Sequence, residues 1–462
     1  MNRRRTPALS RLTVVLLGFV MLNLVGVNLL LMTGLGATML DLSLDHTLAL
    51  LRIKHHFTDS WGAMSVAYHF LKSGAAGSVY QEIFFNQHVK FQYPLSSLLV
   101  FPLMEAFRIE QTYWFRSLKV ASWGFVWLNV MAVLLIFRLA KRAAGIREGK
   151  ADGWIQGVLL VLLAVTFYPV VKAFSLGQIQ TWINAFFALA LLLFMSGKHS
   201  MAGALCGLMC LIKPQYALFM VWGLLRKQIA FTRACFGVLM SGLALSIATF
   251  GPQHLLDYVR VTSFLSRHGE GYYPNQSVNG LLNRLFQNGN NLEWLGDAFP
   301  PFHPGVYAAT MATSVLFILL AIVWRQRPVA QAQWVDFSIL GLVCTMASPI
   351  AWEHHYGVLL PIFALALPFC IGPRTGGRWL ASGLGLSYLL TSHFILATTR
   401  LADSWLNLAQ SYLFFGACVL LVCLWTMRRG VGLNGDPPAP KLEDQAIADA
   451  GYRANLGWPR VM

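Results

Sequence analysis

Four ionisable side chains stand out because charged residues make up only 12% of this 462-residue sequence. Asp59 follows shortly after a pair of histidines, Lys213 precedes a proline, and His354 and His355 are neighbours. A carboxylate can accept a proton from an attacking hydroxyl group, whereas lysine and histidine can stabilise negative charge. A simple membrane anchor or channel would not need this set of residues, which suits a catalytic or binding site.

The elements that must position these residues are membrane helices. Hydrophobic residues make up 56% of the chain and the mean hydropathy is +0.56. Soluble domains carry about 25% charged residues, roughly twice the fraction found here, so a cytosolic globular enzyme is excluded. The long apolar stretches predict an all-α polytopic membrane protein with about twelve transmembrane helices.

The predicted spans are Leu12–Met32, Phe115–Leu139, Trp154–Val171, Thr181–Met195, Met201–Ile212, Gln215–Leu225, Cys235–Phe250, Gly305–Trp324, Val335–Ala347, Tyr356–Ile371, Trp379–Thr399 and Leu406–Met427. Several are shorter than the roughly 20 residues that cross a bilayer. The two spans separated by Lys213-Pro214 are equally compatible with a re-entrant segment.

The distribution of the 35 lysine and arginine residues predicts the orientation. With the N-terminus in the cytoplasm, the clusters at 3–5 and 138–150 and the basic residues of the C-terminus fall on the cytoplasmic side. The net charge of +16 then lies almost wholly on that side, so it reports orientation and not nucleic-acid binding. We expect a multi-pass protein of a bacterial plasma membrane with both termini in the cytoplasm.

One membrane domain is expected over residues 12–427, between a basic N-terminus at 1–11 and a flexible cytoplasmic tail at 428–462. Cleavage of the first span as a signal peptide is the alternative at the N-terminus. All seven cysteines fall in predicted spans, where they indicate packing and not a disulfide framework or a metal site.

Two long external segments are expected at about 33–114 and 251–304. Both are rich in aromatic residues and predict helices that rest at the membrane interface. Residues 93–107 must lie at the outer leaflet without crossing it, because another span would move the basic cluster at 138–150 outside.

Several short motifs follow one another along most of the chain. They are Asp59-Ser60-Trp61, Phe91-Gln92-Tyr93-Pro94, Leu176-Gly177-Gln178, Leu211-Ile212-Lys213-Pro214, Asn275-Gln276-Ser277 with Arg284, and Ser348-Pro349-Ile350-Ala351-Trp352-Glu353-His354-His355. Together they resemble the pattern of glycosyltransferase family 87, polytopic mannosyltransferase-like proteins of the GT-C superfamily. Leu95 departs from this pattern, in which a second proline follows Pro94.

The resemblance implies a GT-C-like fold and inverting transfer of a sugar from a polyprenyl-phosphate donor to a lipid or glycan acceptor on the outer face of the membrane. Mannose is the sugar it suggests, although arabinose, glucose or another hexose is compatible. Asp59 is expected to be the general base. Asp41 and Asp45 are alternatives, because Asp59 lies unusually far from the first span.

The remaining site residues are candidates for the chemistry that the resemblance implies, and Arg267 is not part of a matching motif. Those expected to bind the donor phosphate are Lys213, Arg267, Arg284, His354 and His355, and those expected to bind the sugar or the acceptor are Tyr93, Gln178, Asn275, Gln276, Trp352 and Glu353. No cofactor is expected. No metal ligand is assigned, because Asp59 has no neighbouring acidic residue, and the metal requirement stays open.

Each candidate also has a structural interpretation. Asp59 can cap the helix that follows it, Lys213 can extend its amine to the interface, and the aromatic residues can anchor the chain there. Histidines, including His55 and His56, can form interfacial hydrogen bonds. The alternative function is a flippase or transporter of lipid-linked sugars, although the internal repeats typical of transporters are not evident.

Overall fold

A computed structural model describes residues 10–27, 43–75, 77–323, 330–372 and 377–430. The predicted basic N-terminus lies outside these ranges apart from its last two residues. Asp41 and the tail from residue 431 onwards lie outside them as well.

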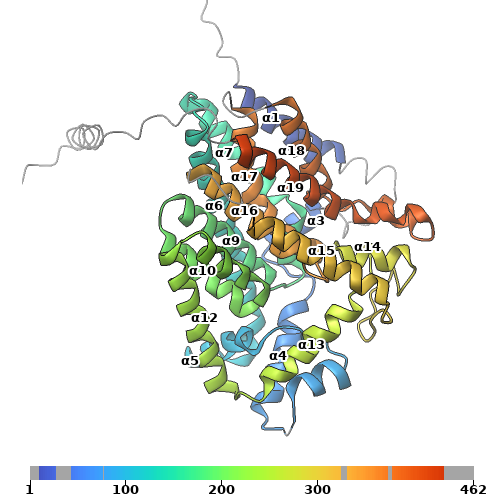
Figure 1. Cartoon of the computed structure of the whole chain (residues 1–462). Helices are drawn as coiled ribbons and strands as arrows, with labels where there is room; N and C mark the ends of the chain where they lie inside the picture. The colour runs from blue at the N-terminus through green and yellow to red at the C-terminus, as the bar shows by residue number, and fades with distance from the viewer. Residues whose placement is uncertain (1–9, 28–42, 76, 324–329, 373–376, 431–462) are drawn as a thin grey trace, which may run out of the picture.

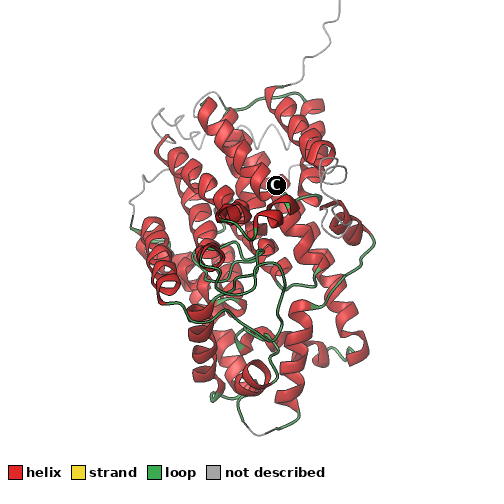
Figure 2. Cartoon of the chain, turned by 90° about the vertical axis from the view of Figure 1, so that its right-hand side faces the viewer, coloured by secondary structure: helices red, strands yellow, loops and turns green. Residues whose placement is uncertain are grey.

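Helices form the regular structure of the described residues, together with one isolated antiparallel bridge between Asn275 and Trp352 (Figure 2). The α-helices are α1 (Arg11–Val20), α3 (Ser43–Leu51), α4 (Asp59–Lys72), α5 (Val100–Ala106), α6 (Trp114–Ala143), α7 (Lys150–Val165), α8 (Tyr168–Ser175), α9 (Gln180–Met195), α10 (His199–Ile212), α11 (Leu218–Leu225), α12 (Ile229–Phe250), α13 (His254–His268), α14 (Val278–Leu285), α15 (Pro304–Ile322), α16 (Ala330–Met346), α17 (Leu359–Ile371), α18 (Arg378–Thr391) and α19 (Tyr412–Gly430). Shorter 3₁₀ or π helices are η1 (Met21–Val27), η3 (Tyr80–Asn86), η4 (Leu95–Leu99), η5 (Gln111–Tyr113), η6 (Pro214–Ala217), η7 (Glu353–Val358), η8 (Leu396–Leu401) and η9 (Trp405–Ser411). The all-α prediction is confirmed.

Five helical stretches of the described chain are long and apolar enough to cross a membrane, and the bent pair α7–α8 adds a sixth if it is one span. The five are Gln111–Ala143, Ile229–Phe250, Pro304–Ile322, Glu353–Ile371 and Trp405–Arg428. They make the chain an integral membrane protein, but they do not confirm twelve spans. Other predicted spans are shorter helices, such as α9 with 16 residues and α10 with 14, whereas a bilayer requires roughly 20.

Prolines account for two breaks in the apolar stretches. The predicted span Trp154–Val171 is divided into α7 and α8, which meet at 51°. Pro169 stands in the first turn of α8, where its missing N–H is harmless, but it cannot continue the hydrogen bonding of α7. Pro214 ends α10 because it confines Lys213 to an extended conformation, with φ −136° and ψ 102°. Both breaks lie beside lysines, Lys172 and Lys213.

The helix α17 lies at the centre of the helical bundle formed by this chain. Of the apolar stretch that contains it, 83% is buried by the rest of the chain, compared with 17% for α15. The helices α6 and α18 pack against α17, and α9 packs against both α6 and α10. The surface open to lipid is therefore contributed largely by α12 and α15.

Parts of the two predicted external segments lie together at one end of the molecule. Figure 1 shows α4, α5 and α13 at the end opposite α1 and α7. The Lys90 ammonium connects the segments: it donates to Glu270 Oε2 at 3.3 Å and to Leu295 O at 2.8 Å, and it lies 3.7 Å from the centre of the Trp294 ring. These segments are thus folded against each other and are not independent loops.

Glycines allow α10 and α12 to pack with their backbones in contact. A Cβ atom on Gly203 would lie 2.0 Å from Phe231 O, and one on Gly207 would lie 2.7 Å from Cys235 O. Small residues at a spacing of four allow this kind of close approach between membrane helices. The contact fixes α10, whose last turn leads into Lys213.

A buried charge cluster joins α16 to α11 and α19. The Asp336 carboxylate accepts hydrogen bonds from Trp222 Nε1 at 2.6 Å, Arg226 Nε at 2.9 Å and Arg428 Nη1 at 2.9 Å. A buried carboxylate requires such partners, and breaking a buried pair costs about 3–5 kcal/mol. The cluster therefore holds the helices together away from the predicted external end.

Replacing Gly203 by leucine is expected to destabilise the protein, because the new side chain would overlap the α12 backbone at Phe231. Overpacking typically costs about 1–3 kcal/mol. The melting temperature of the purified protein in detergent measures the loss. Gly237→Leu is the matched control, since Gly237 lies on α12 with open space around its Cβ position. Equal stability of the two variants would contradict this close packing.

Candidate active site

A pocket of about 260 Å³ brings together side chains from distant parts of the sequence. Its lining residues are Gln92, Tyr93, Gln178, Ile212, Lys213, Pro214, Gln215, Tyr258, Thr262, Leu265, Ser266, Ser348, Pro349, Ile350, Trp352 and His355. Five residues of the predicted site therefore share one pocket: Tyr93, Gln178, Lys213, Trp352 and His355. Ligand pockets usually measure about 300–1,000 Å³, so this one suits a sugar-sized group better than a whole lipid.

Lys213 is the cationic group of the pocket. Its ammonium donates to Gln180 Oε1 at 2.7 Å and lies 2.8 Å from His355 Nε2. Burial lowers the pKa of Lys213 to about 7. A bound anion would favour the charged form and raise that pKa again. The extended backbone that Pro214 imposes on Lys213 thus places an adjustable positive charge at the pocket wall.

Asp59 begins α4 and is held by Gln178. The Gln178 amide donates from Nε2 to Asp59 Oδ2 at 3.2 Å, and the Asp59 backbone N–H donates to Leu176 O at 3.0 Å. The Gln178 carbonyl oxygen accepts hydrogen bonds from Ser60 Oγ and, at 3.4 Å, from Tyr93 Oη. Because Gln178 and Tyr93 line the pocket, Asp59 lies one hydrogen bond from its wall.

The surroundings make Asp59 more basic than an ordinary aspartate. Loss of water around the carboxylate raises the pKa of Asp59, and this effect outweighs the opposing effects of the Gln178 hydrogen bond and the Lys172 charge. The residue nevertheless remains exposed, so it lies outside the closed core and is open to an acceptor. Burial also raises the pKa of Tyr93 to about 12, so its phenol stays protonated and can donate.

Gly177 allows the segment before Asp59 to lie directly against the turn between α8 and α9. Its φ of +69° is a left-handed conformation that glycine adopts without strain. A Cβ atom there would lie 2.6 Å from Phe57 O and 3.1 Å from Thr58 Cα. A hydrogen bond from His56 N to Ser175 O at 2.7 Å holds the approach. In the Gly177-Gln178 motif, Gly177 leaves room for the backbone of Phe57 and Thr58, and Gln178 donates a hydrogen bond to the Asp59 carboxylate.

Lys172 is a charged residue of this region that the sequence analysis missed. It donates to Glu353 Oε2 at 2.7 Å, and Tyr412 Oη donates to the other oxygen of that carboxylate at 3.2 Å. Glu353 is fully buried and does not line the pocket, unlike Trp352 and His355. The signal in the sequence was a lysine directly after an apolar stretch, although a lysine at such an end often only extends its amine to the interface.

The pocket wall supplied by α13 was also missed. Tyr258, Thr262, Leu265 and Ser266 fall on one face of that helix, at the spacing of a helical repeat. Arg267 is the next residue, so it points about 100° away and is exposed. The structure does not bring Arg267 into the pocket.

Asn275 and Gln276 are fully buried and bonded to protein groups. Asn275 Nδ2 donates to Glu270 O at 2.9 Å and Asn275 Oδ1 accepts from Ala351 N at 2.9 Å. Gln276 Nε2 donates to Gln410 O at 2.7 Å. The Asn275 amide ties the chain before α14 to the segment that precedes η7, whereas the Gln276 amide ties it to η9. The structure does not bring either amide to the pocket surface.

Arg284 and His354 are buried beside the site. Arg284 donates from Nη1 to Asn275 O at 3.0 Å and from Nη2 to Ser411 Oγ at 2.6 Å, so its guanidinium serves backbone and hydroxyl groups of the protein. The His354 ring lies 4.8 Å from that of His355. Asp45, the described alternative to Asp59, pairs with His56 at 3.1 Å.

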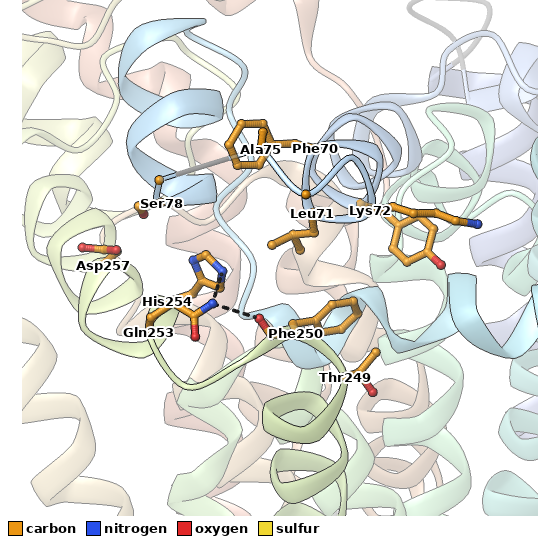
Figure 3. Close-up of a pocket in the computed structure, with 13 residues that line it drawn as sticks. Phe70, Leu71, Lys72, Ala75, Ser78, Thr249, Phe250, Gln253, His254 and Asp257 are labelled. Carbon is orange, nitrogen blue, oxygen red and sulfur yellow. Dashed lines mark hydrogen bonds between the residues drawn. The ribbon is translucent and has the colours of Figure 1, made fainter.

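A second, larger hollow of about 730 Å³ lies where α4 ends and α12 meets α13 (Figure 3). Lys72, His254 and Asp257 are among the residues around it, and Gln253 donates to Phe250 O across its floor at 3.5 Å. It contains none of the predicted site residues. The smaller pocket, which gathers a lysine, a histidine and the glutamine that holds Asp59, is the stronger candidate for chemistry.

The fold is that of a polytopic membrane protein. Its pocket contains a lysine, a histidine and amide side chains of the kinds that enzyme active sites use. Residues 91–349, more than half of the chain, match the family model of Glycosyltransferase family 87, and the chain belongs to that family. It is 25% identical over 349 residues to the polyprenol-phosphate-mannose-dependent alpha-(1-2)-phosphatidylinositol pentamannoside mannosyltransferase of Mycolicibacterium smegmatis, covering 71% of this chain and 77% of that relative. No solved structure matches the chain. The protein is therefore a membrane glycosyltransferase, as the sequence motifs predicted.

Replacing Gly177 by alanine is expected to lower sugar-transfer activity at least tenfold, because the added Cβ would displace Phe57 and with it Asp59. Initial rates of the purified variant, compared at equal amounts of folded protein, measure the loss. Gly197→Ala is the matched control, since Gly197 also has a positive φ of +74° but nothing near its Cβ position. Equal rates in the two variants would show that the close approach has no role in activity.

Proposed function

We propose that this glycosyltransferase transfers a sugar, mannose first among the candidates, from a polyprenyl-phosphate donor to a lipid or glycan acceptor with inversion at the anomeric carbon. Membership of family 87 and the mannosyltransferase relative support the donor class. The observation that carries the proposal is the shared pocket, which is lined by the neighbouring Lys213 and His355 and by Gln178, whose amide is hydrogen-bonded to Asp59.

Asp59 is the general base of this reaction. The acceptor hydroxyl oxygen forms a bond to the anomeric carbon, its proton passes to the Asp59 carboxylate, and the bond from that carbon to the phosphate oxygen breaks. The polyprenyl phosphate leaves with the electron pair. A raised pKa improves a carboxylate as a proton acceptor, and general-base catalysis typically contributes about 10²–10⁴-fold.

Lys213 and His355 bind the phosphate of the donor. Their side-chain nitrogens lie 2.8 Å apart, with the Lys213 ammonium donating to His355 Nε2 and to Gln180 Oε1, so one N–H of the ammonium is left to donate to a phosphate oxygen beside the His355 ring. Charge that is already positioned in a site with little water stabilises the negative charge that develops on a leaving phosphate. Gln180 holds the Lys213 ammonium in place through its hydrogen bond.

Tyr93, Gln178 and Trp352 bind the sugar. Tyr93 keeps its phenol proton and can donate to a hydroxyl group, while the Trp352 ring supplies an apolar face to the lining. Asn275, Gln276, Arg284 and Glu353 support this site from the interior, since their side chains serve protein partners.

The pocket faces the outer side of the membrane in this proposal, with both termini in the cytoplasm. The lysine and arginine distribution supports this orientation through the positive-inside rule. A lipid-linked donor would then present its head group to the pocket while its polyprenyl chain stays in the bilayer. No structural observation favours the alternative of a flippase or transporter.

Asp59→Asn is expected to reduce transfer from polyprenyl-phosphate-mannose by about 10²-fold or more, because the amide cannot accept the proton. The measurement is release of radiolabelled product from purified protein with a lipid acceptor fraction. Asp403→Asn, at an exposed aspartate outside the pocket, serves as the control and should keep normal activity. Near-normal activity in Asp59→Asn would remove Asp59 from the mechanism.

The pH profile of kcat/KM is expected to be bell-shaped. Activity falls on the acid side as Asp59 is protonated, with an inflection above the ordinary aspartate pKa of about 3.9, because the Asp59 pKa is raised. It falls on the alkaline side near pH 7 as Lys213 loses its proton.

Lys213→Arg tests the alkaline limb of this profile. Arginine keeps its charge throughout the accessible range, so the limb should move upward in pH in this variant. An alkaline limb that stays in place would show that it does not arise from Lys213.

A further inference from the structure

Three side chains with metal-binding atoms converge next to the segment that leads into Asp59. Asp45, His46 and His56 each offer one such atom, and these atoms lie within 4.8 Å of one another. Asp45 and His46 belong to α3, whereas His56 lies in the connection between α3 and α4. Two imidazoles and a carboxylate are a ligand set typical of zinc and related divalent ions.

His46 provides an independent observation, because one of its nitrogens is buried without a partner. The side chain is only 5% exposed. Its Nδ1 lies 2.5 Å from Ser175 Oγ, and that hydroxyl donates to Lys172 O at 3.4 Å. The hydrogen bond between Ser175 Oγ and His46 Nδ1 can run in either direction, and in the tautomer in which Ser175 Oγ accepts the Nδ1 proton, Nε2 carries a lone pair that can bind an ion. Within the described chain this Nε2 has no hydrogen-bond partner, and leaving a buried polar atom unsatisfied is costly.

The arrangement is close to that of a tetrahedral site. Bond lengths of about 2.0–2.2 Å put tetrahedral ligand atoms roughly 3.4 Å apart, so small side-chain rotations would close the cluster around an ion. The contact between His46 Nδ1 and Ser175 is the orienting hydrogen bond that metal-bound histidines usually make. The His56 and Asp45 side chains are 17% and 23% exposed, which leaves a route for an ion to enter.

We propose that Asp45, His46 and His56 form a binding site for one divalent cation of the zinc class, with a fourth position open to water. The ion fastens α3 to the connection before α4, in which His56 precedes Asp59 by three residues. Its role is to hold the segment that carries Asp59, and it takes no part in the transfer step itself. The proposal does not depend on the identity of the sugar donor.

A simpler explanation is an ion pair between Asp45 and a protonated His56, with a water molecule at His46 Nε2. The two explanations differ in a direct measurement. The full-length protein is purified in detergent with a tag that contains no histidine, treated with a chelator, and returned to chelator-free buffer. Zinc chloride is then added, and zinc per chain is measured by mass spectrometry after gel filtration.

The expected result is one zinc per chain at micromolar free zinc, with a rise in melting temperature because the ion binds the folded state. His56→Ala and His46→Ala should each weaken zinc binding at least tenfold. His88→Ala, at an exposed histidine outside the cluster, is the control and should bind zinc normally.

His56→Ala keeps the test decisive if the buried His46 variant fails to fold, because His56 is partly exposed. Wild-type protein that binds no zinc would overturn the proposal and leave the ion pair as the explanation. Zinc that binds equally well to wild type and to folded His56→Ala would place the ion elsewhere and would also overturn it. Both readouts are independent of transferase activity, so failure here leaves the proposed reaction untouched.

Discussion

The contact between the turn at Gly177 and the backbone of residues 57–58 determines where the Asp59 carboxylate lies. Glycine is required there because any Cβ atom would strike Phe57 O at 2.6 Å. The next residue, Gln178, donates a hydrogen bond to the carboxylate of Asp59 and also lines the pocket. The adjacent residues Gly177 and Gln178 therefore set both the distance of this carboxylate from the pocket and its orientation. The bend between α7 and α8 brings this turn to the pocket, since α8 ends immediately before it.

Polar residues around the site divide into two groups with different physical roles. Lys213, His355 and Gln178 present atoms to the pocket. Asn275, Arg284 and Glu353 are buried behind it, where each bonds to backbone or to oppositely charged groups. A buried polar group is tolerated only with such partners, and for that reason it fixes the packing of the segments it joins. The buried group therefore makes rigid the segments that carry the pocket-lining group.

Much of the helical architecture could be predicted from the sequence, because long apolar stretches in a membrane leave few alternatives to helices. The span count could not, since α9 and α10 are too short to assign by length and Pro169 divides one stretch. Motifs indicated Asp59, Gln178 and Lys213 as neighbours of one site. They did not distinguish surface from interior, because an amide such as Asn275 looks the same in sequence whether it faces a sugar or a backbone carbonyl. Lys172 and the α13 wall depend on tertiary contacts that no local pattern encodes.

The hydrogen bonds of the site connect residues that are far apart along the chain: 119 positions separate Asp59 from Gln178, and 142 separate Lys213 from His355. Contacts of this range close large loops, so closing them costs more chain entropy than pairing neighbouring helices such as α9 and α10. We therefore expect the pocket to assemble after the helix pairs that surround it. Mutations that weaken helix packing anywhere in the bundle should then impair catalysis before they reduce the amount of protein inserted in the membrane.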